Sequence, residues 1–164
     1  MKYLFCTILF ICTSTVVFSQ NYTRDAGIRV GEGFFVNYRQ FYDDDRALEA
    51  MAGVSKHGLK VLALREFFRS LTTERFEHIK LMYGYGMHLG VNYTNKYRIL
   101  NRVYYHDWRW TPQIGFDGIV GFEYIAEELP LIISAAAQPY FEFSLNQYFR
   151  IRPFNFVVSF RYRF

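Results

Sequence analysis

The stretch Phe154-Asn155-Phe156-Val157-Val158-Ser159-Phe160-Arg161-Tyr162-Arg163-Phe164 decides the fold. A β-strand places successive side chains on opposite faces. One face of this strand would carry Phe154, Phe156, Val158, Phe160, Tyr162 and Phe164, and the other would carry Asn155, Val157, Ser159, Arg161 and Arg163. A soluble sheet would bury the aromatic face in a core, whereas a membrane barrel would expose it to lipid and hold the arginines inside. The rest of the chain decides between these two arrangements.

The amino-terminal segment has the features of an export signal. Lys2 supplies a positive charge, residues 4–17 are apolar apart from small Thr and Ser, and Ser19 offers a small residue before a cleavage point. The sequence therefore predicts a signal peptide at residues 1–19 and an outer-membrane β-barrel domain at residues 20–164. Both cysteines, Cys6 and Cys12, lie within the signal, so no disulfide is expected in the mature chain. A closed barrel, in which every backbone group is paired, would supply stability instead.

The composition favours a membrane barrel over an aromatic-rich soluble sandwich. The chain has 18 Phe and 14 Tyr, and aromatic side chains form belts at the two membrane interfaces of such barrels. After the signal, no apolar run reaches the ~20 residues that a spanning helix needs, whereas a tilted spanning strand needs only ~9–11. The formal net charge is +4, with basic and acidic residues interleaved. Nucleic acid is therefore not an expected partner.

Alternation with a period of two recurs along the chain. It predicts eight strands, at residues 27–41, 47–55, 59–69, 79–93, 97–105, 114–124, 131–143 and 154–164. Glu32 interrupts the apolar face of the first strand, which indicates a bulge. Pro139 is predicted to be a local irregularity within one long strand.

The links between these strands differ in length. Short links are predicted at residues 43–45, 56–58, 94–96 and 127–129, and longer ones at residues 72–77, 106–112 and 146–153. Short periplasmic turns and longer outer loops are typical of bacterial outer-membrane barrels, and an even strand number would place both termini in the periplasm.

In its signal peptide, alternating strands and final strand, the chain resembles the small eight-stranded outer-membrane β-barrel proteins, in the style of OmpX and the OmpA membrane domain. The stretch GFDGIVGFEY at residues 115–124 is similar to barrel proteins of the Bacteroidetes type. The resemblance implies an antiparallel up-and-down eight-stranded transmembrane β-barrel in the outer membrane. It also implies that the aromatic residues Phe160, Tyr162 and Phe164 act as an assembly signal for the barrel-assembly machinery. We expect a monomer without a cofactor.

The inward faces of the predicted strands carry many charges. These are Arg29, Arg39, Glu49, Lys60, Glu66, Lys80, Asp117, Glu123, Glu142, Arg161 and Arg163. Side chains just fill an eight-stranded barrel, and an unpaired buried charge costs several kcal/mol. We therefore expect a salt-bridged plug, with Glu66, Asp117 and Glu123 as partners for Arg161 and Arg163. A gated conduit or a ligand site is the alternative.

The histidines give no pattern of a catalytic or metal site. His57, His78, His88 and His106 are scattered, and none lies beside a Ser in a matching motif. A nucleophile and its base must lie within hydrogen-bond reach, so we expect no enzyme activity. A lipid A-modifying barrel enzyme and a soluble lipocalin-like ligand-binding barrel remain alternatives.

The expected function is a structural or surface-interaction role in the outer membrane, with outer-membrane lipid and lipopolysaccharide as partners. Arginines in the predicted outer loops would contact lipopolysaccharide phosphates or remain solvated. These are Arg75, Arg109, Arg150 and Arg152.

Overall fold

The structure, a computed structural model, describes residues 23–56, 58–71, 78–99, 102–126, 129–145 and 149–164. These residues form an all-β fold. The strands are β1 (Arg24–Val30), β2 (Gly33–Asp43), β3 (Arg46–Ser55), β4 (Gly58–Ser70), β5 (Ile79–Ile99), β6 (Arg102–Ile125), β7 (Leu131–Ala137), β8 (Tyr140–Ser144), β9 (Arg150–Arg152) and β10 (Phe156–Arg163). Within the described ranges, no helix is long and apolar enough to cross a membrane.

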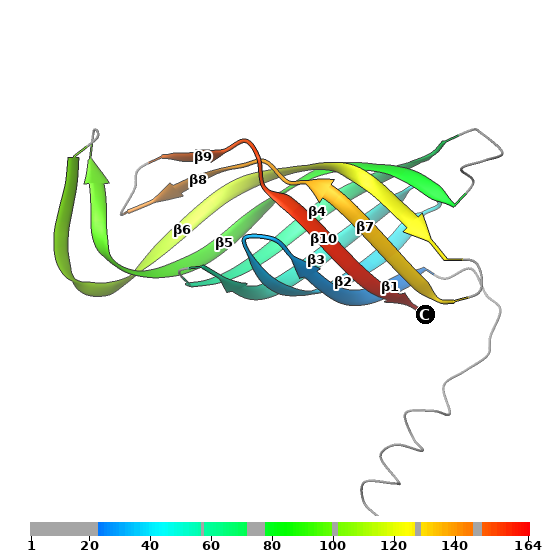
Figure 1. Cartoon of the computed structure of the whole chain (residues 1–164), viewed down its shortest axis with the longest axis horizontal. Coiled ribbons are helices and arrows are strands. Elements are labelled where there is room, and N and C mark those ends of the chain that lie inside the picture. The colour runs from blue at the N-terminus through cyan, green and yellow to red at the C-terminus, as the bar shows by residue number, and fades with distance from the viewer. Residues whose placement is uncertain (1–22, 57, 72–77, 100–101, 127–128, 146–148) are drawn as a thin grey trace, which may run out of the picture.

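The strands close into one antiparallel barrel (Figure 1). Each strand from β1 to β6 pairs with the next one along the chain, β6 pairs with β7, β7 pairs with β10, and β10 returns to β1. β8 continues β7 beside β6, and β9 continues β10 beside β8. The ten described segments therefore occupy eight positions around the barrel, and the predicted eight-stranded antiparallel barrel is confirmed.

The predicted single strand at residues 27–41 is wrong, because the chain reverses within it. Val30 pairs with Phe34 across the turn, and the backbone amide of Gly31 donates to the carbonyl of Gly33 at 3.0 Å. Paired residues share a face, and their numbers here differ by an even amount. The alternation of apolar and polar side chains therefore continues unbroken through the turn. Glu32 lies in this turn and not in a strand bulge.

Residues 97–105 are not a separate fifth strand. Residues 97–99 end β5 and residues 102–105 begin β6, with Ile99 paired to Arg102. The predicted turn at 94–96 is a register shift inside β5, and the predicted loop at 106–112 lies inside β6. β5 and β6 thus form one long hairpin that projects beyond the other strands (Figure 1). The sequence pattern counts β1 and β2 as one strand, and it counts β5 and β6 as three. These two errors cancel, so the predicted number of eight strands agrees with the structure.

The predicted alternation of short and long links is also wrong. We call the end where β1 begins and β10 ends the terminal end, and the opposite end the hairpin end (Figure 1). The Asp44–Asp45 turn and the link between β4 and β5 lie at the terminal end, while the link between β3 and β4 lies at the hairpin end. Because the turn at Gly31 was not predicted, the first three predicted links each lie at the end of the barrel opposite to the one expected. Residues 72–77, 127–128 and 146–148 lie outside the described residues, and β9 occupies residues 150–152 of the predicted last loop.

Pro139 separates β7 from β8 without shifting the register. β6 pairs with β7 at Val120 and Ala137, and with β8 at Asp117 and Tyr140, so the offset between the strands is the same on both sides of the break. The amide of Gly118 donates to the carbonyl of Pro139 at 2.8 Å. As predicted, residues 131–143 form one barrel strand with a local irregularity.

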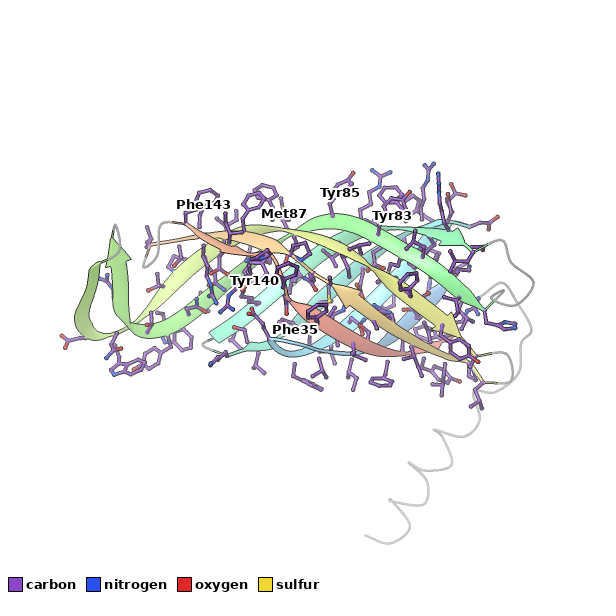
Figure 2. All side chains as sticks on the ribbon, turned by 45° about the horizontal axis from the view of Figure 1, so that its top comes forward. Phe35, Tyr83, Tyr85, Met87, Tyr140 and Phe143 are labelled. Carbon is purple, nitrogen blue, oxygen red and sulfur yellow. The ribbon has the colours of Figure 1, made fainter. Side chains whose placement is uncertain are left out.

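The outer surface of the barrel is apolar. Tyr85 is 58% exposed and Met87 47%, whereas the next residue, His88, is 1% exposed. Figure 2 shows Tyr83, Tyr85, Met87 and Phe143 pointing outward from the strands. Soluble proteins place large apolar side chains inside, as a soluble ligand-binding barrel would require. The side chains of this barrel have the opposite arrangement.

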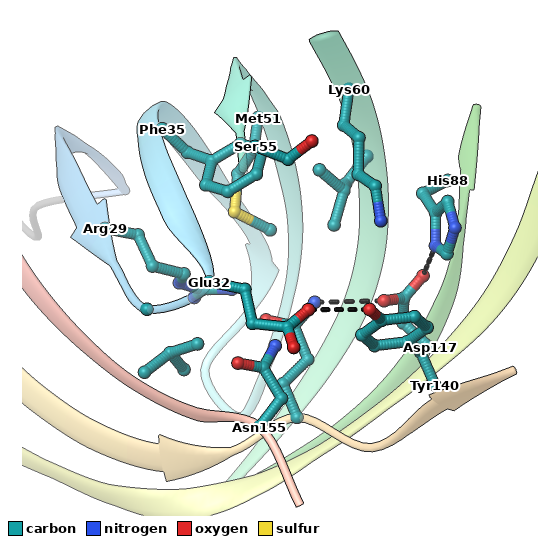
Figure 3. Close-up of a pocket in the computed structure, with 14 residues that line it drawn as sticks. Arg29, Glu32, Phe35, Met51, Ser55, Lys60, His88, Asp117, Tyr140 and Asn155 are labelled. Atoms are coloured by element: carbon teal, nitrogen blue, oxygen red, sulfur yellow. Dashed lines mark hydrogen bonds and ion pairs between the residues drawn. The ribbon is translucent and has the colours of Figure 1, made fainter. Parts of the chain in front are cut away.

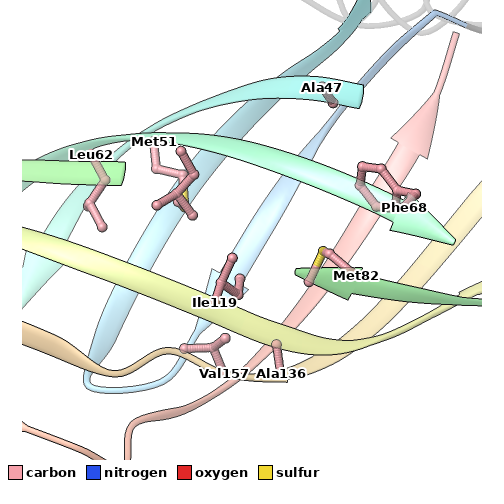
Figure 4. Packing of buried hydrophobic residues seen from close by; sticks show 9 residues of the cluster. Ala47, Met51, Leu62, Phe68, Met82, Ile119, Ala136 and Val157 are labelled. Atoms are coloured by element: carbon pink, nitrogen blue, oxygen red, sulfur yellow. The ribbon is translucent and has the colours of Figure 1, made fainter. Parts of the chain in front are cut away.

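A smaller apolar cluster lies inside the barrel (Figure 4). It consists of Ala47, Met51, Leu62, Leu64, Phe68, Met82, Ile119, Ala136 and Val157. The ring of Phe41 packs on Phe68 with centroids 5.2 Å apart. These residues occupy space beside the charged groups, in a barrel whose interior is just wide enough for side chains to fill.

Candidate functional site

The structure places the predicted inward charges at two depths. Eight of them are buried: Arg29, Arg39, Glu49, Glu66, Asp117, Glu123, Glu142 and Arg161. The side chain of Lys60 also points inward and is 11% exposed. Lys80 and Arg163 are half-buried and line a cavity of about 450 Å³ at the terminal end, together with Glu123.

Arg39 is the centre of the buried network. Its Nη2 lies 2.8 Å from Oδ2 of Asp25, and its Nη1 lies 2.7 Å from Oε2 of Glu123 and 3.2 Å from Oε2 of Glu66. The guanidinium carbon also lies 4.9 Å from the ring centroids of Phe41 and Phe68. Such contacts add cation–π attraction to the ion pairs.

Arg161 and Arg29 meet at Glu49. Arg161 Nη2 lies 2.8 Å from Glu49 Oε1, and Arg29 Nη2 lies 2.6 Å from Glu49 Oε2. Each arginine also donates to a serine hydroxyl on a neighbouring strand: Arg161 to Ser134 at 3.0 Å, and Arg29 to Ser159 at 2.9 Å. Both carboxylate oxygens of Glu49 are thus bound by cations, as a buried carboxylate requires.

We call these seven groups the central network: Asp25, Arg29, Arg39, Glu49, Glu66, Glu123 and Arg161. Glu123 connects its two halves, because its Oε2 lies 2.7 Å from Arg39 Nη1 and 3.5 Å from Arg161 Nη1. Three guanidiniums face four carboxylates, and each guanidinium lies within 4 Å of at least two of these carboxylates. Its ion pairs join side chains from β1, β2, β3, β4, β6 and β10 across the interior.

The partners expected for Arg161 are only partly right. Of the three predicted acids, Glu123 contacts it, but the short ion pair is with Glu49. Asp117 instead pairs with His88, and Glu66 with Arg39. The odd or even position of a residue in its strand determines whether its side chain faces inward. The contacts between inward side chains depend in addition on the tilt and register of strands on opposite walls.

Asp25 of the central network, and three uncharged side chains that bind the network, were missed from the sequence. Asp25 is fully buried and contacts Arg39, yet it precedes the predicted first strand. The odd-numbered residues of that strand face inward. Starting the strand two residues earlier, at Asp25 instead of Gly27, would have included Asp25 among them. Asn37, which donates to Glu49, and the two serines lie on inward faces but are uncharged.

A second buried cluster, the histidine cluster, lies nearer the hairpin end. His88 Nδ1 lies 2.6 Å from Asp117 Oδ2, and His88 Nε2 lies 3.2 Å from Glu142 Oε2. Glu142 also pairs with Lys60 Nζ at 2.9 Å, and Gln138 donates to Asp117 at 3.1 Å. The imidazole therefore bridges two carboxylates from β6 and β8, which fixes its orientation.

Tyr140 separates this cluster from the hairpin-end mouth. Its hydroxyl donates to Glu32 Oε2 at 2.6 Å, so the turn between β1 and β2 is tied to β8 across the interior. Figure 3 shows this bond and the nearby bond between His88 and Asp117 around a cavity of about 40 Å³. This volume accommodates at most a few waters, so this cavity has no room for a larger ligand.

The other predicted site residues have different positions. His57 and Arg75 lie outside the described residues, His78 adjoins β5, and His106 and Arg109 belong to β6. Arg150 and Arg152 lie on β9 and not in a free loop. Across the described part of the chain, no group of three or more His, Cys, Asp or Glu side chains is arranged to hold a metal ion.

The fold and its interior define a class: a closed eight-stranded antiparallel barrel with an apolar outer face and ion pairs inside. The chain is similar in structure to the N-terminal β-barrel domain of OprF from Pseudomonas aeruginosa, with a TM-score of 0.51 and 11% sequence identity. The match covers 88% of this chain and 100% of the other. At this identity the likeness shows the fold alone. No family model and no curated protein matches the sequence.

Proposed function

We propose that the protein is a small integral outer-membrane β-barrel, plugged by its own side chains, with a structural or surface-interaction role. One observation carries the proposal: the barrel is apolar outside and ion-paired inside. A closed barrel satisfies all its backbone groups and leaves no sheet edge, so it can stand in lipid. The central network supports the plug, because its buried side chains join strands on opposite walls of the barrel by ion pairs.

The β5–β6 hairpin supports the surface-interaction role. It projects past the rest of the barrel (Figure 1) and carries Trp108 and Trp110, both more than half exposed. Tyr93 packs against both rings, with centroids 5.0 and 5.1 Å away. In the proposed orientation, both termini lie in the periplasm, and this aromatic group lies where the barrel meets the outer lipopolysaccharide leaflet. Trp and Tyr rings favour that interface.

The proposal includes the export and assembly steps. Residues 1–19 would be removed as a signal peptide, and the barrel-assembly machinery would recognise Phe160, Tyr162 and Phe164. All three side chains point outward and are about half exposed, so they are accessible on a strand that has yet to pair. The protein would act as a monomer with outer-membrane lipid and lipopolysaccharide as partners, and without catalysis.

Cell fractionation and ion conductance test location and plug separately. We expect the protein to stay with outer membranes after carbonate extraction, and the purified barrel to give no steady conductance in planar bilayers. Release by carbonate would contradict the membrane location. A stable conductance from the wild-type barrel would contradict the plug while leaving the location intact.

Replacing the last residue tests the assembly signal. In Phe164→Ala, we expect the folded fraction in cells to fall several-fold, while the refolded protein keeps a melting temperature close to that of the wild type. The reason is that Phe164 is half exposed and packs in no core. The folded fraction is read from the heat-dependent mobility of the barrel on gels. Phe154→Ala, which removes an exposed ring just before β10, is the control. An equal loss in both variants would contradict a specific signal.

A further inference from the structure

The mouth at the hairpin end opens into a cavity of about 290 Å³ whose wall is basic. We call this cavity the vestibule. Four of its lining residues are cationic and one is acidic; the full lining is Glu32, Ser55, Lys56, Lys60, Asn92, Tyr140, Arg150 and Arg152. We propose that the vestibule is a binding site for a phosphate-class oxyanion, and this proposal does not depend on the membrane location or on the plug.

The strand register places the two arginines on the inner face. Arg152 pairs with Tyr140, and Arg150 pairs with Glu142, and cross-strand partners point to the same side of a sheet. Because Tyr140 and Glu142 are buried in the interior, the arginine side chains project into the mouth. Residues two apart on a strand are separated by roughly 6.6 Å, a spacing that suits two neighbouring anionic groups.

The charges of the wall are only partly neutralised. Lys60 is held by Oε2 of Glu142 at 2.9 Å and Arg152 by Glu32 at 3.3 Å. Arg150 Nη1 lies 3.8 Å from Oε1 of Glu142, which is too long for a hydrogen bond. Lys56 is exposed at the turn after β3. The four cations of the lining face two carboxylates, Glu32 in the lining and Glu142 just beneath it. The vestibule therefore carries a formal charge of +2.

The floor of the vestibule is closed and polar. Tyr140 donates its hydroxyl to Glu32 and supports Lys60 on its ring, with Nζ 4.7 Å from the centroid. Asn92 adds a side-chain amide on the β5 side. Guanidiniums bind phosphate oxygens in a bidentate manner, and a partly enclosed wall of one sign concentrates counter-ions. These features favour an oxyanion over a neutral or cationic ligand.

Inorganic pyrophosphate is a suitable probe for the full-length barrel, folded in a phosphate-free, uncharged detergent. By isothermal titration calorimetry we expect saturable binding that weakens as ionic strength rises. The variant Arg150→Gln/Arg152→Gln should bind at least tenfold more weakly, and Lys56→Gln severalfold. Arg109→Gln, which removes an exposed arginine of the projecting hairpin that does not line the vestibule, should bind like the wild type.

Folding of each variant is checked by heat-dependent gel mobility. Absence of saturable binding to the wild type, or an equal loss in Arg109→Gln, would overturn the proposal. Competition then distinguishes the source of the oxyanion. If bicelles containing lipid A displace pyrophosphate, the group belongs to a lipid headgroup; if they do not, it belongs to a soluble phosphorylated solute. Both results require the same site.

Discussion

Replacing Arg39 by methionine is expected to lower the free energy of unfolding by about 3–5 kcal/mol. The substitution keeps much of the side-chain volume but removes the cation that holds Asp25, Glu66 and Glu123. The four carboxylates of the network would then face only two guanidiniums, and the nearest guanidinium nitrogens to Asp25, Glu66 and Glu123 would lie 3.5–3.7 Å away. Burying charge that is not fully paired is costly. Urea unfolding of the barrel refolded in lipid vesicles measures the change.

An exposed arginine provides the matched control for this experiment. Arg46 pairs with Asp43 and Asp45, but its side chain is 46% exposed, so Arg46→Met should change the stability by no more than about 1 kcal/mol. In the double variant Arg39→Met/Glu123→Gln, part of the loss should be recovered, because one unpaired carboxylate is neutralised. A loss below 1 kcal/mol in Arg39→Met would show that water reaches the central network.

Replacing Gly27 by alanine should prevent the barrel from closing, or destabilise it by about 3 kcal/mol, the upper part of the usual range for overpacking. Gly27 pairs with Arg161 where β1 meets β10, and a Cβ there would overlap the carbonyl oxygen of Phe160. The obstacle is backbone, so no side-chain rotation can relieve it. Only a separation of the two strands that close the barrel makes room.

Gly118 is the control for this substitution. A Cβ at Gly118 would meet only Pro139, with its nearest atom at an ordinary 3.5 Å, so Gly118→Ala should fold like the wild type. The folded fraction of both variants is read from heat-dependent gel mobility after refolding. If Gly27→Ala folds as well as Gly118→Ala, the seam between β1 and β10 is wider than the structure indicates.

The directions of the side chains were predictable from the sequence, because a strand has a period of two. Alternation alone predicts that Tyr85 and Met87 face outward and that Glu66 and Glu123 face inward, as they do in the structure. The same period hid the turn at Gly31. A hairpin whose paired residue numbers differ by an even amount continues the alternation, so no break in the pattern marks the reversal.

The contacts inside the barrel were less predictable. The pairing of Arg161 with Glu49, and of His88 with Asp117 and Glu142, depends on strand register and on the shear of the closed barrel. Neither quantity follows from alternation. The basic vestibule was missed for a similar reason: Arg150 and Arg152 were assigned to a loop, whereas β9 aligns them with Tyr140 and Glu142.

The central network has a consequence for the order of folding. Glu49 and Arg161 are separated by 112 residues, and Arg39 and Glu123 by 84, so neither of these two ion pairs can form within a single hairpin, whereas Asp25 and Arg39 face each other on β1 and β2. Contacts between such distant residues make folding slow. The interior can exclude water only after β10 has joined β1, and until then its charges remain hydrated. Barrel closure and the formation of these long-range ion pairs would therefore occur as one late, cooperative event.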